Sequence, residues 1–468
     1  MQTRASLIIP VENQVRELDP KLLLACIAAK AGFSSYIGSR LELDFRIASL
    51  PRSIYLSKSM TARSIKMFRI MRKLGHKIAV WDEEALVHMQ AETYFNRRLA
   101  TDAIKHVSIL FAWGRENLDL WKQYPDLPRG LPIHITGNPR GDMLRPEWRD
   151  YFADEVDALR KQHGDFILIN TNFSNVNAFV PGLNLFLPEK TPGVEQKYAR
   201  GAVGMSREFA EGLHDFKQAV FDDFKQMIPA IERAFPSHTI IVRPHPTEDM
   251  GVYHDIAANC SRVKVINEGN VIPWLLASKA LVHNSCTTGI EAFILGVPAI
   301  TYMASRDEYY DEGYYRLPNK LSHQCFTFDE LQTTLGKVLA GELGAASGSE
   351  RTRLVEYYLA ALDGPLACER ITDVLVSVAD SWAGSPTTPI HRRLEGWYLA
   401  NRRRVAKWYK SFQPGSKYRP EFQRHRYPSL ALDEIKNRVA RIQRLLQARE
   451  NLKVTQISAH IFKIEQHE

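Results

Sequence analysis

The stretch Ala280-Leu-Val-His-Asn-Ser-Cys-Thr-Thr-Gly-Ile-Glu-Ala-Phe-Ile-Leu-Gly-Val-Pro-Ala-Ile-Thr-Tyr302 decides the fold. Its apolar run 280–283 predicts a buried strand, 290–295 predicts a short helix, and 297–302 predicts a second strand. A strand, a helix and a strand in close succession form a βαβ unit, in which the two strands are parallel. Ligands of open parallel sheets bind beyond the carboxyl ends of the strands, so residues directly after each strand matter most.

The same alternation of short apolar runs and helical stretches extends over most of the chain. A first series of strands is predicted at 6–11, 34–37, 53–56, 77–81, 107–112 and 133–136. A second series is predicted at 165–170, 239–242, 263–266, 280–283 and 297–302. The predicted fold class is therefore α/β, with two Rossmann-like, doubly wound domains and a cleft between them.

Length and charge divide the chain further. At about 100–200 residues per domain, 468 residues predict two or three domains. We place them at 1–150 and at 151–382, followed by a basic, helical tail at 383–468 that begins with a linker-like stretch, 384–389. Residues 391–468 carry 18 Lys and Arg against 7 Asp and Glu, whereas the rest of the chain is slightly acidic. The body therefore gives no reason to expect nucleic acid binding.

The composition excludes several classes of protein. Hydrophobic residues make up 45% of the chain and charged residues 24%, as in ordinary globular proteins, and no apolar run approaches the length of a membrane span. The first ten residues are expected to form a strand and not a signal peptide. Five scattered cysteines without a Cys-x-x-Cys pair favour a reducing cytoplasm. No cofactor and no catalytic metal are predicted, because no motif has the spacing of metal ligands.

Two motifs at strand ends carry groups that suit an activated phosphate. In Val242-Arg243-Pro244-His245-Pro246, Arg243 would clamp a phosphate, and His245 would donate to a phosphate oxygen or act as a general acid. The alternative is a rigid turn with a surface arginine and a packed histidine. In the second motif, residues 283–292, small polar residues would let backbone N–H groups approach an anion at a helix N-terminus, and Glu291 would accept from ribose hydroxyls. A simple capping box is the alternative there.

Weaker candidates follow other predicted strands. Asn170 and Asn172 follow the strand 165–170 and offer amide groups, although a plain polar turn explains them equally well. Glu83 and Glu84 follow the strand 77–81, where a carboxylate would serve as catalytic base or nucleophile, or would simply begin a solvated helix. Asn138 and Arg140 end the first series of strands and are candidates for the acceptor side.

The chain resembles glycosyltransferases of the two-Rossmann, GT-B type through Arg243–Pro246, Asn284–Glu291 and the following run to Ile300. More closely, residues 5–330 resemble bacterial surface carbohydrate biosynthesis proteins related to retaining Kdo (3-deoxy-manno-octulosonate) transferases. This closer resemblance also rests on Arg16–Ala25, Trp81–Val87, Thr136–Glu147 and Ile167–Phe173.

The resemblance implies a metal-independent transferase of capsule or lipopolysaccharide biosynthesis with a CMP-activated donor, an ulosonic acid such as Kdo, and a glycan or lipid-linked acceptor. It implies that Arg243 and His245 neutralise the phosphate of the leaving CMP, with Glu291 at the ribose. The remaining nucleotide-binding residues implied are Asn284, Ser285, Thr287, Thr288 and Gly289. An acidic nucleophile is also implied, for which Glu83 and Glu84 are the candidates, and the stereochemical outcome stays open.

Three alternatives remain. CDP-glycerol glycerophosphotransferases share a His-Pro element and a Ser-rich loop, although their usual Asp-Tyr-Ser-Ser pattern is replaced by His283-Asn284-Ser285-Cys286 here. Nonhydrolysing UDP-N-acetylglucosamine 2-epimerases share the fold. A nucleotide-sugar-binding protein without catalysis is the third alternative.

The tail has its own candidate role. Its segment 391–426 combines basic residues with Trp397, Tyr398, Trp408, Tyr409 and Phe412, a composition suited to the anionic face of a membrane. We therefore expect a cytoplasmic protein that attaches to the inner face of the cytoplasmic membrane. A helical appendage that packs on the body or forms a dimer is the alternative.

Overall fold

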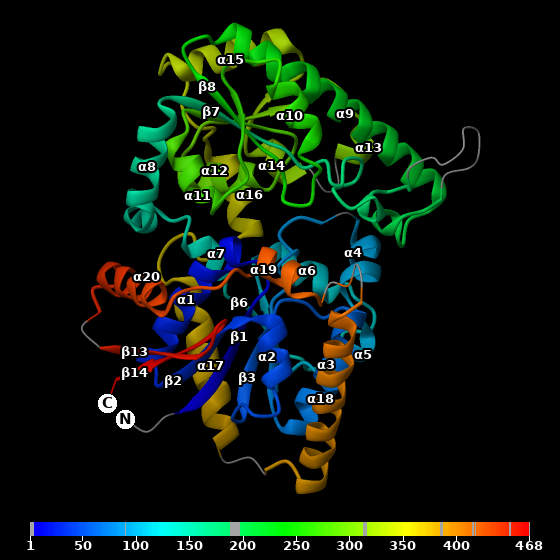
Figure 1. Cartoon of the computed structure of the whole chain (residues 1–468), viewed down its shortest axis with the longest axis vertical. Helices are drawn as coiled ribbons and strands as arrows, with labels where there is room; N and C mark the ends of the chain where they lie inside the picture. Colours follow the sequence, from blue (N-terminus) through cyan, green and yellow to red (C-terminus); the bar gives the residue numbers. More distant parts are fainter. Residues whose placement is uncertain are drawn as a thin grey trace. The chain divides into compact units, whose positions relative to one another are not determined.

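The computed structural model describes residues 4–88, 90–187, 197–311, 316–383, 387–413, 416, 418–448 and 451–467 (Figure 1). The chain forms two compact units. Unit 1 comprises Met1–Leu86, Arg98–Tyr151 and Glu356–Glu468, and unit 2 comprises Val87–Arg97 and Phe152–Val355. The predicted boundary at 150/151 lies next to the passage into unit 2. The chain returns to unit 1 at Glu356, ahead of the predicted boundary at 382/383, and half of the linker-like stretch, residues 384–386, lies outside the described residues.

Unit 1 contains a sheet with the strand order β13-β14-β2-β1-β3-β4-β5-β6. Its strands are β1 (Ala5–Val11), β2 (Phe33–Ser39), β3 (Ser53–Ser57), β4 (Lys77–Val80), β5 (Ile109–Ala112), β6 (Ile133–Ile135), β13 (Leu452–Ser458) and β14 (Ile461–Gln466). The six strands from β2 to β6 in this order are parallel, and β14 runs antiparallel to β2. The first predicted series of strands is therefore confirmed within one or two residues at most ends.

The helices of unit 1 surround this sheet. They include α1 (Gln14–Lys30), α2 (Arg40–Arg46), α3 (Ile65–Leu74), α5 (Thr101–Ile104), α6 (Arg115–Lys122), α7 (Pro139–Asp142), α17 (Ala367–Ala383), α18 (Ile390–Ser411), α19 (Pro420–Arg426) and α20 (Leu432–Leu445). Helix α1 is almost wholly buried because α17 and α20 both pack against it. Helix α17 is anchored by the buried Asp142, whose carboxylate accepts from the backbone N–H groups of Ala367 and Cys368. The segment that returns from unit 2 is thus tied to the core of unit 1.

The sequence predicted a helical tail, but the tail is helical only in part. The helices α18, α19 and α20 lie in it, and the predicted amphipathic helix is α20, whose buried face is Ile435, Val439 and Ile442. The last described residues, however, form the hairpin β13–β14, and β14 extends the sheet at β2. Gly38 of β2 permits this pairing, because a Cβ atom there would lie 2.0 Å from the carbonyl oxygen of His460.

Unit 2 contains a second sheet with the order β12-β11-β10-β7-β8-β9, and all its neighbouring strands are parallel. Its strands are β7 (Phe166–Asn170), β8 (Thr239–Arg243), β9 (Val263–Val265), β10 (Ala280–His283), β11 (Ala299–Tyr302) and β12 (His323–Cys325). The order changes direction between β10 and β7, as in doubly wound folds. Such a reversal point is where the loops at the carboxyl ends diverge and leave room for a ligand.

Helices cover both faces of this sheet. Those of unit 2 include α8 (Ala153–His163), α9 (Arg207–Ala234), α10 (Gly251–Ala257), α11 (Val271–Ala277), α12 (Thr288–Leu295), α13 (Glu308–Asp311), α14 (Arg316–Lys320) and α15 (Phe328–Leu339), with α4 (Ala91–Arg98) and α16 (Ser349–Tyr358) at its boundaries. Residues of α9, α10 and α15 form one core with Ile167, Ile169 and Val242. On the other face, the ring of Phe166 packs at 6.0 Å from that of Trp274 in α11. Both faces are buried, which explains the continuous apolar runs of these strands.

No described helix has the length and apolar character needed to span a membrane. All five cysteines lie among the described residues and carry free thiols.

We predict that Gly38→Ala destabilises unit 1 by about 2 kcal/mol or more, because the new methyl group would meet the backbone of His460 and separate β14 from β2. The melting temperature measures this effect. Gly336→Ala is the matched control: a Cβ atom added there would meet no atom within 4 Å, and alanine favours the helix α15, so the melting temperature should stay or rise. A Gly38→Ala protein as stable as the parent would contradict the close approach.

Candidate functional site

The sequence motifs of unit 2 meet at the carboxyl ends of three adjacent strands. Asn170 of β7 lies in register with Arg243 of β8 and with His283 of β10. The loops that follow these strands contain Asn172, His245 and Ser285 respectively. The structure therefore brings together the two motifs that the sequence placed about 40 residues apart, together with the β7 loop.

A buried carboxylate, Glu248, connects two of these loops. It is 3% exposed and accepts from the backbone N–H of His245 at 2.9 Å, from the Thr171 hydroxyl at 3.1 Å, and from the Tyr253 hydroxyl at 2.5 Å. Its own N–H donates to the carbonyl of His245, which closes the turn. Burial raises the pKa of Glu248, and the donated hydrogen bonds only partly offset this effect. The sequence analysis missed Glu248, although an acid three residues after His245 resembles the spacing of a capping box.

The imidazole of His245 is held by its own loop. Its Nδ1 accepts from the backbone N–H of Thr247 at 3.3 Å and lies 2.7 Å from the Thr247 hydroxyl. The Ser174 hydroxyl of the β7 loop lies 3.3 Å from the same nitrogen and 2.6 Å from the Thr247 hydroxyl. Because Nδ1 accepts, the proton of the neutral ring sits on Nε2. His245 is half-buried and is thereby set up as a donor through Nε2.

Reciprocal hydrogen bonds join the β10 loop to the β7 loop. The Asn284 side chain accepts from the N–H of Asn172 at 2.9 Å and donates to the carbonyl of Asn172 at 3.2 Å. Asn284 therefore positions backbone, in addition to the nucleotide contact that the resemblance implies. Ser285, next in the chain, has a φ of 60°, in the left-handed region that a residue with a side chain rarely adopts. Such outliers often mark functional turns.

His283 and Gly289 explain the sharpness of this turn. His283 is fully buried; its Nδ1 accepts from the N–H of Cys286 at 3.1 Å, and its Nε2 lies 2.8 Å from the Ser322 hydroxyl. Burial lowers the pKa of His283 to about 3, so the ring is neutral. A Cβ atom at position 289 would lie 2.6 Å from its Nε2. Gly289 is thus required for packing against His283, whereas the sequence analysis attributed it to the approach of an anion.

The remaining predicted nucleotide contacts lie at the same edge of the sheet. Thr287 and Thr288 begin α12, and Glu291 is buried in its first turn. Asn170 is 3% exposed, and its Oδ1 has no hydrogen-bond partner among the described residues. A buried amide oxygen without a partner is costly, and a ligand donor at this strand end would satisfy it.

Arg243 is oriented differently from our expectation. Its guanidinium donates to the carbonyl oxygens of Glu268 at 2.7 Å and Gly269 at 2.5 Å, and it lies 5.4 Å from the ring of Trp274. Burial lowers the pKa of Arg243 to about 10, which leaves it charged at neutral pH. The side chain holds the loop after β9, so we do not include it among the groups that would bind phosphate.

Unit 1 carries a cluster of ion pairs at the carboxyl ends of its own strands. Lys58, after β3, lies 2.7 Å from Glu12 and 3.1 Å from Glu17, while Lys21 lies 2.7 Å from Glu17. Arg40 lies 3.4 Å from Glu12. Burial acts to raise the pKa of Glu12, but Lys58 and Arg40 outweigh it and lower that pKa to about 2. None of these residues was predicted as a site residue, although Glu17 and Lys21 lie in the stretch Arg16–Ala25 on which the resemblance rests.

The two predicted carboxylates of unit 1 differ from one another. Glu83 is 6% exposed and belongs to the cluster: its Oε1 accepts from the indole of Trp81 at 2.8 Å and lies 3.5 Å from Lys21. Glu84 is exposed. The surrounding protein removes part of the water around the carboxylate, which acts to raise the pKa of Glu84, but nearby cations, Arg16 foremost, lower it. Glu84 is therefore an accessible, ionised carboxylate, whereas Glu83 is engaged within the fold.

The predicted acceptor-side residues lie in the same unit. Asn138 is buried and caps α7, since its Oδ1 accepts from the N–H of Arg140 at 3.0 Å. The Arg140 guanidinium lies 5.9 Å from the Trp113 ring and is one of the cations that lower the pKa of Glu84. Arg140 thus remains a candidate for an anionic acceptor, while Asn138 has a structural role.

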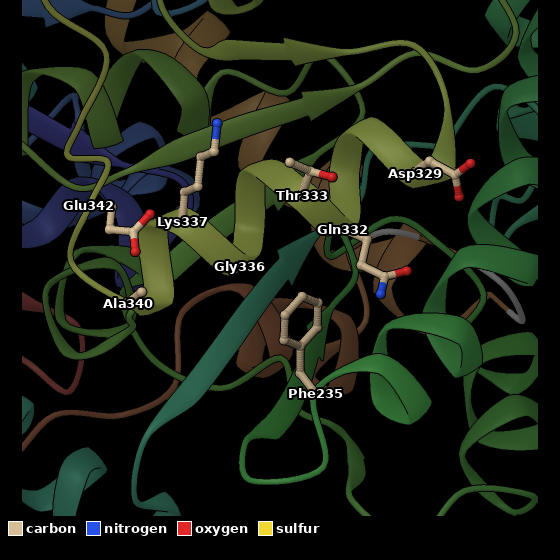
Figure 2. Close-up of a pocket in the computed structure, with 8 residues that line it drawn as sticks. All are labelled: Phe235, Asp329, Gln332, Thr333, Gly336, Lys337, Ala340 and Glu342. Atoms are coloured by element: carbon tan, nitrogen blue, oxygen red, sulfur yellow. The ribbon is translucent and has the colours of Figure 1, made fainter.

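A separate hollow of about 550 Å³ lies along α15 in unit 2. Its lining residues are Phe235, Asp329, Gln332, Thr333, Gly336, Lys337, Ala340 and Glu342. Figure 2 shows Asp329, Lys337 and Glu342 pointing in different directions, so they do not converge on a common point. The predicted site residues are all absent from this lining. Among the described residues, no group of three or more histidine, cysteine or acidic side chains is placed to hold a metal ion.

We predict that Glu248→Ala lowers the free energy of unfolding by about 3 kcal/mol, because the buried N–H of His245 and the hydroxyls of Thr171 and Tyr253 lose their acceptor. Chemical denaturation measures this. The exposed Asp255→Ala of α10 is the control and should leave the stability within about 0.5 kcal/mol. Equal stability of both variants would show that Glu248 does not hold the loops.

We predict that Glu12→Gln weakens the loss of stability in acid. The folded-state pKa of Glu12 is about 2 against a usual value of 4.5, so its contribution is present above pH 4.5 and is lost as the pH falls toward 2. Unfolding midpoints measured across this range should depend less on pH in the variant. The exposed Glu356→Gln should keep the pH profile of the parent, and an unchanged profile for Glu12→Gln would contradict the role of the cluster.

Comparisons with known proteins agree with this architecture. No family model matches the chain, and no curated protein matches it. Among solved structures, a variant of the wall teichoic acid polymerase TagF aligns over 82% of this chain and 91% of its own, at 11% identity and a TM-score of 0.51. TagF itself aligns over 81% and 90%, at 11% identity and a TM-score of 0.50. The UDP-GlcNAc 2-epimerase of Methanocaldococcus jannaschii aligns over 80% and 99%, at 12% identity and a TM-score of 0.46. The chain is thus an α/β protein with two parallel-rich sheets and a GT-B-like, two-Rossmann fold.

Proposed function

We propose that the chain is a transferase that binds a cytidine-nucleotide-activated donor in unit 2 and releases CMP. The observation that carries this proposal is the arrangement of His245, whose Nδ1 is occupied as an acceptor so that the proton of the neutral ring lies on Nε2. The strained turn at Ser285 and the unsatisfied Oδ1 of Asn170, both at the carboxyl edge of the same sheet, support a ligand there.

In the proposed reaction His245 acts on the leaving group. A hydroxyl oxygen of the acceptor forms the new bond, the bond between the transferred group and the phosphate oxygen of CMP breaks, and its electron pair goes to that oxygen. Nε2–H of His245 donates to the CMP phosphate as its negative charge increases, which is the role of a positioned acid or hydrogen-bond donor. The accessible carboxylate of Glu84 in unit 1 is the candidate to accept the proton of the acceptor hydroxyl.

Two kinds of donor release CMP, and we favour the first. A CDP-linked polyol transfers its polyol phosphate when the acceptor attacks the β-phosphorus. The fold likeness to the wall teichoic acid polymerase TagF, at a TM-score of 0.51, supports this donor.

A CMP-linked ulosonic acid would instead transfer the sugar through cleavage of its C–O bond. The resemblance over residues 5–330 to retaining Kdo transferases supports this second donor. Two of its motifs, Arg16–Ala25 and Trp81–Val87, meet in the ion-pair cluster of unit 1, through Glu17, Lys21 and Glu83.

The acceptor and setting follow from the same proposal. A glycan or lipid-linked glycan of the cell surface would receive the transferred group, and Arg140 would attract an anionic acceptor. The five free thiols suit the reducing cytoplasm, where nucleotide-activated donors are made.

We predict that His245→Ala lowers kcat by about 10²- to 10⁴-fold, because the developing charge on CMP loses its donor. CMP release measured with a CDP-polyol or a CMP-ulosonate is the readout. His238→Ala is the matched control, because His238 directly precedes the strand β8 and His245 follows the other end of that strand. This variant should retain the parent rate. An unchanged rate in His245→Ala would remove His245 from the mechanism.

Calorimetric titration with CMP, CDP and UDP tests the donor class separately. Binding of CDP above CMP supports the polyol donor, and selective binding of CMP supports the ulosonate donor. Selective binding of UDP would overturn the proposal in favour of a UDP-sugar enzyme such as an epimerase. Binding of CMP or CDP without turnover of either donor would identify a nucleotide-binding protein without catalysis.

A further inference from the structure

Helix α18 exposes a group of large apolar side chains. Eight of them are between 56% and 75% exposed: Ile390, Leu394, Trp397, Tyr398, Val405, Trp408, Tyr409 and, at the C-cap, Phe412. Isolated exposed apolar residues are normal on protein surfaces, but a contiguous group marks an interaction surface. We call these eight residues the α18 apolar face.

The helical period places all eight on one side. At 100° per residue they fall within an arc of about 120°. The opposite side is anchored to unit 1, where Gly396 and Ala400 are buried. A Cβ atom at Gly396 would lie 3.0 Å from Cβ of Lys73 in α3, and Figure 1 shows α18 running alongside α3. The anchoring therefore turns the α18 apolar face away from the body of unit 1.

Basic side chains border the α18 apolar face on both edges. The exposed Arg393 and Arg404 follow one edge of the arc, and the exposed Arg402 follows the other. The helix contains seven Lys and Arg residues and one acidic residue, Glu395, which is paired with Lys73 of α3. An occupant of this surface must therefore be both apolar and anionic.

This charge distribution separates two possible occupants. A second copy of the chain, docked by the same face, would bring two strongly cationic helices together and would be opposed by their repulsion. The boundary between the headgroups and acyl chains of an anionic bilayer accepts the apolar side chains, and its headgroups neutralise the arginines. Trp and Tyr residues are also favoured at this boundary.

We propose that α18 binds in the plane of an anionic membrane surface, with the α18 apolar face in the boundary between headgroups and acyl chains. This goes beyond the proposed transfer reaction and does not depend on it. The helix is too charged to span a bilayer, since basic residues occur near its start, at 392 and 393, and again at 402–404, 407 and 410. It would therefore lie on the surface.

Flotation of the full chain with lipid vesicles tests the proposal. We expect the parent protein to float with vesicles of phosphatidylcholine and phosphatidylglycerol, and to remain behind with phosphatidylcholine alone. Trp397→Ser with Trp408→Ser should weaken partitioning at least about tenfold, because two buried aromatic contacts with the bilayer are lost. Arg393→Gln with Arg404→Gln should weaken it about tenfold or more at low salt.

Controls separate this outcome from others. Tyr357→Ser with Ile457→Ser removes two exposed apolar residues of unit 1 outside α18 and should partition like the parent. Unchanged melting temperatures would show that the surface variants fold. Failure of the parent to float, or flotation of both α18 variants like the parent, would overturn the proposal. A dimer that dissociates on Trp397→Ser with Trp408→Ser, without flotation of the parent, would overturn it in favour of an interface between copies.

Discussion

The geometry of the candidate site in unit 2 depends on one buried carboxylate, Glu248. Its two oxygens accept from the backbone of His245 and from the side chains of Thr171 and Tyr253, so the loops after β7 and β8 are held at a fixed separation. A buried donor without an acceptor lowers the free energy of unfolding, so the N–H of His245 and the hydroxyls of Thr171 and Tyr253 all depend on Glu248. The orientation of His245 follows from this arrangement, because the turn that carries its ring is closed by Glu248.

The two units differ in the groups that surround their carboxylates. In unit 1, Glu12, Glu17 and Glu83 face Lys21, Lys58 and Arg40, so that charges of both signs offset one another. In unit 2, Glu248 receives neutral donors only, and burial raises its pKa. The unit 1 cluster therefore pairs charges of both signs, whereas the carboxyl edge of the unit 2 sheet carries a histidine whose Nδ1 is an acceptor and the unsatisfied amide oxygen of Asn170.

The sequence predicted the strands far better than the contacts of the site. Buried parallel strands are continuous apolar runs, and these identified β1 to β11. The hairpin β13–β14 was missed because no residue of β13 is buried and polar residues interrupt both strands, so neither is a continuous apolar run. At the site, the end of a predicted strand shows that a residue lies at the carboxyl edge of the sheet, but it does not show which group the side chain contacts. Arg243 donates to two carbonyl oxygens, and Asn284 hydrogen-bonds to the backbone of Asn172. These contacts depend on the course of loops, which no local sequence pattern specifies.

The pairing of β14 with β2 has a consequence for synthesis on the ribosome. Residues 461–466 pair with the strand 33–39, which is made more than 400 residues earlier. Both segments of unit 2 precede the third segment of unit 1, so the unit 2 sheet is able to assemble while the β2 edge is still unpaired. An unpaired strand edge is a template for association with other chains. The nascent chain therefore exposes the β2 edge until residues 461–466 are made, and the pairing of β14 with β2 ends this exposure.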